Sequence, residues 1–437
     1  MGPATAGVGS IAEVPTAQRA RDPRPGLVLA LAWAVAFSLR TGFIGLGPIL
    51  PDLAADLRLS NTAASTLVAI PTLMMGLVAV VGGALADRWG PARAIALGLA
   101  GVAVGGGLRA ATGAWPPLLL ATVLFGAGIG LAQPALPRLM RGLFPHRLGL
   151  STGVYASGLV TGSILAATLT RPVEGRFFPE AGWRGPLLLW AALAAATLAV
   201  WLAALQPWWW PGPPTASSTN IRIDPDSTTH HPQPAILPWS PWRDRGAWVV
   251  ALLCAAQGVA YYLMVAWLPA VYRDLGLDEG RTGALFALFN AATLPAILGF
   301  PVLSDRIGSR RLPCLAAAMM FTAGGLGYAL APVAFPVAWF WPILAGAGVS
   351  ALFAMTLVLP ADVAPAGQVG AAAGMVLAIG YAGSALGPVL AGVVRDLTGG
   401  FATALATLPV VGVLALLLAS AVPAPGGRRR RSPADGR

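Results

Sequence analysis

The chain has 437 residues, of which 56% are hydrophobic and only 10% charged, and its mean hydropathy is +0.72. Soluble globular proteins carry about 25% charged residues, and a chain with so few cannot cover a large water-exposed surface. Despite a net charge of +11, the composition therefore excludes a soluble enzyme, a nucleic-acid binder and a disordered scaffold. It predicts a membrane protein with many spans.

Residues 1–26 are rich in Pro, Ala and Arg and contain no apolar run, which predicts a disordered cytoplasmic tail. Twelve apolar segments follow, each near the roughly 20 residues that a helix needs to cross a bilayer. Their predicted limits are 27–49, 62–85, 94–111, 116–138, 150–170, 185–206, 246–271, 282–303, 312–331, 336–358, 369–391 and 402–422. The chain is thus predicted to form two six-helix halves, 27–206 and 246–422, followed by a basic cytoplasmic tail, 423–437.

Between the halves, residues 207–245 are polar and rich in Pro, Ser and Thr, which predicts a flexible cytoplasmic linker. The positions of the Arg residues predict the orientation, because cytoplasmic loops carry an excess of positive charge. With a cytoplasmic N-terminus, 19 of the 28 Arg residues face the cytoplasm and 8 face outside, while Arg40 lies inside a helix. We therefore expect a multi-pass protein of a bacterial inner membrane with both termini in the cytoplasm.

The two halves repeat each other at an offset of 218 to 221 residues. Leu85-Ala-Asp87-Arg88-Trp-Gly90 follows the second segment, and Leu303-Ser-Asp305-Arg306-Ile-Gly308 follows the eighth. The further matches pair Pro51 to Leu57 with Pro269 to Leu275, Gly126-Ala-Gly128 with Gly346-Ala-Gly348, and Gly149, Gly153, Gly162 and Ser163 with Gly370, Gly374, Gly383 and Ser384. Repeats of this kind place a solute site at the interface of the halves, near the bilayer midplane.

The six-plus-six repeat and the motif Gly83-Ala-Leu-Ala-Asp87-Arg88-Trp-Gly90-Pro-Ala-Arg93 resemble the major facilitator superfamily. The degenerate second copy is Pro301-Val-Leu-Ser-Asp305-Arg306-Ile-Gly308-Ser-Arg310-Arg311. The resemblance implies an all-α membrane protein of 12 transmembrane helices, which transports by rocking its halves in alternating access.

The resemblance also implies a gating role for the motif. Asp87 would lie at the positive N-terminal end of helix eleven, supported by Arg88 and Arg93, and would stabilise the outward-open state. The alternative is that Arg88 and Arg93 only enforce topology. The predicted gating residues are Gly83, Asp87, Arg88, Gly90, Arg93, Asp305, Arg306, Gly308 and Arg310.

A narrower resemblance points to one branch of that superfamily. Arg40, Pro48-Ile-Leu-Pro51, Phe144 to Tyr155, Gln257 to Tyr262, and Ala266-Trp267-Leu268-Pro269 are similar to the cyanate porter branch. The branch contains cyanate transporters and 2-nitroimidazole exporters, which implies a small anionic or dipolar solute.

Arg40 is the charge that falls near the middle of a predicted span. An ionised side chain at mid-bilayer costs about 2.5–3.5 kcal/mol on insertion scales, so such a residue is a functional candidate. Its planar guanidinium offers five donors and suits a small anion. We expect Arg40 to bind solute. The alternative is that it snorkels or binds carbonyls at a helix break near Gly42, Gly45 and Gly47.

Neutral polar residues complete the predicted site. Gln257 and Tyr261 are four residues apart and share a helix face, which we expect to lie opposite Arg40. The predicted substrate-binding set is Arg40, Gln133, Tyr155, Gln257, Tyr261, Asn290 and Tyr381. The alternatives are packed aromatic rings for the Tyr residues and helix–helix hydrogen bonds for Asn290 and Gln133. Arg109 and Arg171, at outer helix ends, are predicted to be interface residues.

The residue types that the predicted spans lack restrict the possible transport mechanisms. No Asp, Glu or His falls in the middle of a predicted span, which disfavours a side-chain proton relay and favours facilitated diffusion, anion exchange or a solute that carries its own proton. The sequence contains no nucleophile–base pair, metal cluster or phosphate-binding loop, so we expect neither an enzyme nor a cofactor.

The predicted function is secondary active or facilitative transport of a small anionic or dipolar solute. The alternatives are a multidrug-type exporter of neutral hydrophobic compounds, a nitrate/nitrite-like carrier and, from another class, a non-transporting membrane sensor. The expected partners are a small solute and the lipid bilayer, without nucleic acid, and the protein is expected to be a monomer.

Overall fold

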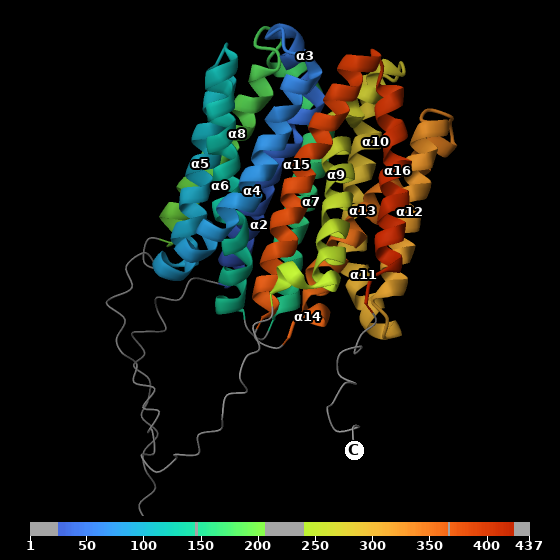
Figure 1. The fold of residues 1–437 in the computed structure, drawn as a ribbon. Coiled ribbons are helices and arrows are strands. Elements are labelled where there is room, and N and C mark those ends of the chain that lie inside the picture. Colours follow the sequence, from blue (N-terminus) through green and yellow to red (C-terminus); the bar gives the residue numbers. More distant parts are fainter. Residues whose placement is uncertain (1–24, 145–146, 206–239, 366–367, 424–437) are drawn as a thin grey trace, which may run out of the picture.

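The computed structural model describes residues 25–144, 147–205, 240–365 and 368–423. These residues form a bundle of long helices joined by short loops, with α3 at one end and α14 at the other (Figure 1). We call these the α3 end and the α14 end. Within the described residues, twelve helical stretches are long and apolar enough to cross a membrane. The predicted all-α class and twelve spans are therefore confirmed.

Each half supplies six of these spans. The first half contains α2 (Pro25–Ile44), α3 (Leu46–Asp56), α4 (Asn61–Trp89), α5 (Pro91–Ala111), α6 (Trp115–Leu143), α7 (Leu148–Phe177) and α8 (Arg184–Leu205). The second half contains η2 (Pro241–Arg243), α9 (Arg245–Asp274), α10 (Glu279–Ala291), α11 (Thr293–Ile307), α12 (Arg311–Leu330), η3 (Val337–Trp339), α13 (Phe340–Val358), α14 (Pro360–Val363), α15 (Val369–Thr398) and α16 (Phe401–Ser420). Several helices extend beyond the predicted apolar segments, because polar residues continue them past the hydrophobic core.

Polar caps and glycines set the helix ends. Asp244 begins α9 by accepting from the Ala247 amide at 3.0 Å, and Asp278 begins α10 by accepting from the Arg281 amide at 2.8 Å. Gly90 ends α4 at a φ of +88°, and Gly308 ends α11 at +63°. L side chains rarely adopt these angles, which accounts for a glycine at this place in both copies of the motif.

The halves use the same glycines to pack their helices closely. A Cβ on Gly128 of α6 would lie 2.6 Å from the Gly98 carbonyl oxygen of α5. At the equivalent place in the second half, a Cβ on Gly348 of α13 would lie 2.5 Å from the Phe321 amide of α12. Small residues let helix backbones approach each other in a membrane. The sequence repeat therefore becomes a repeated helix–helix contact.

The halves meet mainly where α4 packs on α15, α7 on α10, and α3 on α9. In Figure 1, α15 runs between α4 and α9, and it packs against both. The predicted terminal tails and most of the predicted linker lie outside the described residues, so those predictions stay open.

Candidate functional site between the two halves

Arg40 lies on α2, one turn before the break at Gly45 that separates α2 from α3. Its Nη1 atom is buried and has no hydrogen-bond partner. The guanidinium interacts with the phenols of Tyr261 and Tyr262 on α9 and of Tyr381 on α15. None of the ion pairs among the described residues involves Arg40. A cation from one half therefore faces three neutral phenols from the other.

Gln133 extends this polar cluster. Its Nε2 atom lies 3.5 Å from the Tyr381 hydroxyl and donates to it across the two halves. Gln133 and Arg40 also line the same narrow gap, which is too tight in this conformation to hold a water molecule. The gap is lined by Leu39, Arg40, Phe43, Met75, Ile129, Gln133 and Leu159. Four members of the predicted set, Arg40, Gln133, Tyr261 and Tyr381, are thus brought together.

Aromatic rings lie between this cluster and the α3 end. Tyr261 stacks on Phe289 with ring centroids 5.7 Å apart, and Phe289 stacks on Phe286 at 6.4 Å. Phe43 of the first half meets Tyr262 edge-on at 5.7 Å. Phe286 also lines a pocket near the α3 end, so a row of stacked rings runs from Tyr261 to that pocket.

The other three predicted residues make no hydrogen bond, ion pair or ring contact with Arg40 in the described part of the chain. Gln257 donates to the Cys254 carbonyl at 3.0 Å, and Asn290 donates to the Phe286 carbonyl at 2.9 Å, each within its own helix. Tyr155 is half-buried and lies near Arg141. The Asn290 Oδ1 atom is buried and keeps no hydrogen-bond partner, so Asn290 retains a free acceptor.

Tyr262 is the member of the site that sequence reasoning did not select. Its side chain is only 6% exposed, and it interacts with the Arg40 guanidinium directly. The helix-face argument chose Gln257 and Tyr261 from their spacing of four residues. The Tyr261-Tyr262 dipeptide was the available signal, but adjacent residues point about 100° apart, so only the packing of α9 shows that both rings approach Arg40.

Arg109 is buried inside the first half, and its predicted place at the membrane interface stays a prediction. The side chain is 1% exposed, lies over the Phe125 ring at 4.7 Å, and keeps its Nε and Nη2 atoms without partners. The cause is helix packing. α8 covers this face of α5, with Ala191 directly against Gly106.

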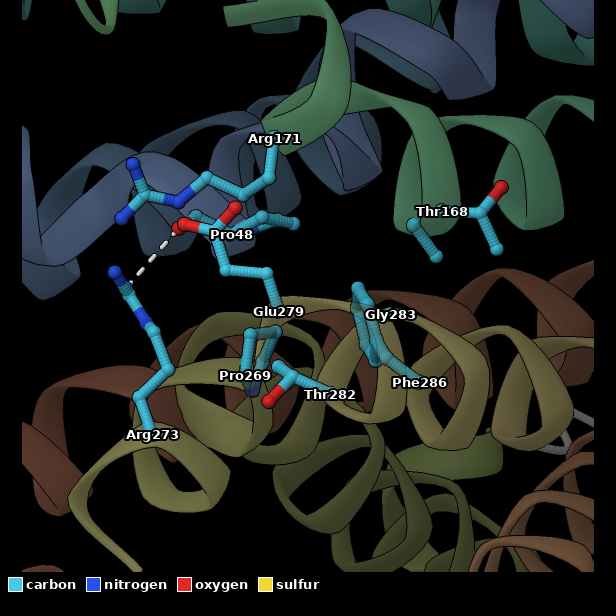
Figure 2. Close-up of a pocket in the computed structure, with 10 residues that line it drawn as sticks. Pro48, Thr168, Arg171, Pro269, Arg273, Glu279, Thr282, Gly283 and Phe286 are labelled. Carbon is cyan, nitrogen blue, oxygen red and sulfur yellow. Dashed lines mark hydrogen bonds between the residues drawn. The ribbon is translucent and has the colours of Figure 1, made fainter. Parts of the chain in front are cut away.

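Arg171, the second predicted interface residue, lies at a contact between the halves. Arg171 of α7 and Arg273 of α9 extend into the same space on either side of Pro48, and the dashed line marks Arg273 donating to the Pro48 carbonyl at 3.1 Å (Figure 2). Both guanidinium groups also bind Asp52 of α3, Arg273 at 3.5 Å. A small pocket lies beside them. Because Asp52 and Arg273 come from opposite halves, this network joins the halves at the α3 end.

Further contacts close the same end. The Trp267 indole of α9 donates to the Ser65 hydroxyl of α4 at 3.1 Å. A Cβ on Gly47 would collide with the Val265 carbonyl oxygen, so α3 and α9 touch through their backbones. The α3 end is therefore closed in this conformation.

The first motif copy lies at the α14 end. The Gly83 carbonyl accepts from Arg138 of α6, and Arg88 is exposed. Asp87 lies in the last turn of α4. Its predicted docking on helix eleven, which is α15, stays a prediction.

The second motif copy forms a clamp within its own half. Arg310 donates to Asp305 at 2.5 Å, to Ser304 at 3.0 Å and to Asp362 of α14 at 3.1 Å. The hydrogen bond to Asp305 raises the pKa of Arg310, which therefore stays charged. Arg306, by contrast, is exposed. Sequence reasoning missed Asp362, because it lies 52 residues from Arg310 and carries no motif.

Comparisons with known proteins agree with this architecture. The chain matches the Major Facilitator Superfamily over residues 32–344 and again over 270–436. The cyanate transport protein CynX of Escherichia coli is 28% identical over 90% of this chain and 96% of its own length. The 2-nitroimidazole transporter of Escherichia coli is 26% identical over 89% of this chain and 92% of its own.

A solved structure shows the same fold. The nucleoside transporter NupG has a TM-score of 0.70 at 14% identity, and the match covers 90% of this chain and 99% of NupG. The family match spans most of the chain, and the relatives match along nearly all of their lengths. The chain therefore belongs to the Major Facilitator Superfamily, as a multi-pass membrane transporter and not an enzyme.

Proposed function

We propose that the protein carries a small anionic or strongly dipolar solute across the membrane by alternating access, with Arg40 as the group that binds it. The observation that carries this proposal is the environment of the Arg40 side chain. Its guanidinium lies at the interface of the halves, with a buried Nη1 atom that has no partner and with phenols as its polar neighbours.

The chemistry of the cluster favours an anion. An unpaired guanidinium repels a cation and attracts a carboxylate or another planar anion, to which it donates two parallel hydrogen bonds. The hydroxyls of Tyr261, Tyr262 and Tyr381 and the Gln133 amide add neutral donors for the remaining oxygen or nitrogen atoms. The narrowness of the gap favours a small solute over a bulky one.

The relatives support the same solute class. One is a cyanate transport protein and another a 2-nitroimidazole transporter, so one transports a small anion and the other a small dipolar ring. Both match along nearly the whole of their lengths, including the helices that carry Arg40 and the three phenols.

The conformation fits alternating access. The α3 end is closed by contacts between the halves, so solute cannot reach Arg40 from that end in this state. We assign the α14 end to the cytoplasm, because both copies of the Arg-rich motif lie there and cytoplasmic loops carry excess positive charge. The structure is then an inward-facing or occluded state. Transport is facilitative, by exchange, or coupled to a proton on the solute itself.

The proposal is tested with purified protein. Thermal shift with cyanate, nitrate, nitrite, formate and acetate identifies a ligand, and flux in proteoliposomes then measures its transport. We expect Arg40→Gln to weaken binding by roughly 10- to 100-fold, because a hydrogen-bonded charge is worth about 1.5–3 kcal/mol. Arg40→Lys should recover little, since an ammonium lacks the planar fork.

The matched control is Arg281→Gln, which removes an exposed Arg at the α3 end; its side chain is 63% exposed. We expect normal binding and flux from this variant. Normal anion flux in Arg40→Gln would overturn the role of Arg40. Flux of neutral hydrophobic compounds alone would favour an exporter, and binding without flux would favour a sensor.

A further inference from the structure

We propose that Asp396 is the latch that holds the α3 end closed, and that its release and return are steps of the transport cycle. The proposal rests on the alternating access proposed above. It makes Asp396 a positioning residue, because the carboxylate acts on the equilibrium between conformations and does not touch solute.

The carboxylate joins the two halves through four hydrogen bonds. Asp396 lies in the last turn of α15, and both of its partners lie in the first turn of α4, in the opposite half. Its Oδ1 atom accepts from the Asn61 amide at 3.0 Å and from Asn61 Nδ2 at 2.8 Å. Its Oδ2 atom accepts from the Thr62 amide at 2.8 Å and from the Thr62 hydroxyl at 2.6 Å.

These bonds complete the start of α4. The first amides of a helix have no partner within the helix, and they lie at the positive end of the helix dipole, where an anion is stabilised. Ser60 caps α4 by accepting from the Ala63 amide. The amides of Asn61 and Thr62 are therefore satisfied by Asp396. The first turn of α4 is capped partly by its own half and partly by the other.

The backbones also meet closely at this place. Gly392 lies one turn before Asp396 on α15, and a Cβ there would lie 2.6 Å from the Asn61 carbonyl oxygen and would collide with the Ser65 hydroxyl. The capping geometry therefore exists only while α4 and α15 are in contact. Opening the α3 end would separate the carboxylate from both amides at once.

Two other carboxylates at the same end are bound differently. Asp56 accepts from the Trp183 indole at 3.0 Å and from Arg184 at 2.9 Å, both in its own half. Asp274 pairs with Arg395 at 3.4 Å, also in its own half. Asp52 does bridge the halves, but its distance to Arg273 is 3.5 Å. Asp396 thus makes shorter and more numerous hydrogen bonds across the interface than Asp52 does. Asp56 serves as the matched control, because its carboxylate lies at the same end but bonds only within its own half.

The test measures how often the α3 end opens. Thr282 is 7% exposed and lines the pocket near that end, between the halves (Figure 2). In a Thr282→Cys background, a membrane-impermeant maleimide reports opening through its alkylation rate in proteoliposomes. The chain without this substitution supplies the background, because Cys254 and Cys314 are buried.

We expect Asp396→Asn to be alkylated roughly two- to fivefold faster than the parent, the range that loss of an anion at a helix N-terminus corresponds to. Asp56→Asn should react at the parent rate. Thr62→Val removes one of the four bonds and should give a smaller increase. It keeps the test available if Asp396→Asn does not fold.

Transport gives a second readout that a purely structural role would not produce. With a solute offered from the α3 side, Asp396→Asn should lower both KM and kcat, because the binding-competent state is more populated and closure is slower. Equal alkylation of parent and Asp396→Asn, or equal acceleration by Asp56→Asn, would overturn the latch. Alkylation needs no solute, so it can support the latch even if the proposed anion transport fails.

Discussion

Tyr262 is one of the three phenols that interact with the Arg40 guanidinium. The ring is buried between the halves, and it touches both Phe43 and Tyr261 edge-on. Arg40 and Tyr262 are contributed by different halves. A solute that bridges the guanidinium and this phenol would therefore be sensed by both halves, which is what alternating access requires of a binding site.

Removing the Tyr262 hydroxyl tests this arrangement. We expect Tyr262→Phe to raise the transport KM about tenfold at little cost in stability, because the ring keeps its packing while a hydrogen bond to a charged group is lost. The measurement is proteoliposome flux over a range of solute concentrations.

The control for that prediction is Tyr272→Phe. Tyr272 is also buried, but its hydroxyl lies 3.1 Å from that of Tyr328, with no contact to Arg40. A KM that rises equally in both variants would show that lost phenols act through the fold, and the assignment of Tyr262 would fail.

At the scale of the helices, the Arg310 clamp at the α14 end joins neighbouring elements of the second half. Arg310 precedes α12, Asp305 lies in α11, and Asp362 lies in the short α14 that leads toward α15. One guanidinium thus fixes three elements of the second half. Arg306 belongs to the same motif but is exposed. The two arginines differ in contacts, although the sequence motif treats them alike.

We expect Arg310→Gln to lower the melting temperature of the purified protein by a few degrees, corresponding to about 1 kcal/mol. The Arg310 side chain is only 19% exposed, but its partner Asp305 is 68% exposed and solvent weakens that pair. Arg306→Gln should melt like the parent in the same fluorescence assay. Equal loss of stability in both variants would contradict the clamp.

Within the described residues, helix-to-helix contacts hold the two halves together. The helix pairs α4 with α15 and α7 with α10 join the halves along the bundle. We therefore expect a protease site inserted between residues 207 and 239 to be cleavable without loss of function. After cleavage, the two fragments should copurify and retain most of the flux.

Native gels and flux on the same sample provide the check. Fragments that separate after cleavage would show that the linker contributes to assembly. An uncleaved chain with the same insertion controls for effects of the inserted residues.

The sequence predicted the parts that depend on local composition. Twelve apolar runs, the glycines that end α4 and α11, and the mid-span position of Arg40 follow from residues close together in the chain, because the bilayer sets segment length and the cost of charge. The repeat at offsets of 218 to 221 residues predicted two like halves, and the shared packing of Gly128 and Gly348 follows from it.

Only the tertiary structure decided which side chains meet. Tyr262, Asp362 and Asp396 acquire their partners across 52 or more residues of chain, through the angle and depth at which helices pack. Arg109 is buried with its guanidinium over Phe125 of α6, and Gln257 and Asn290 bond to their own helices. Composition determines which segments enter the membrane, whereas helix packing determines which polar groups remain free to act there.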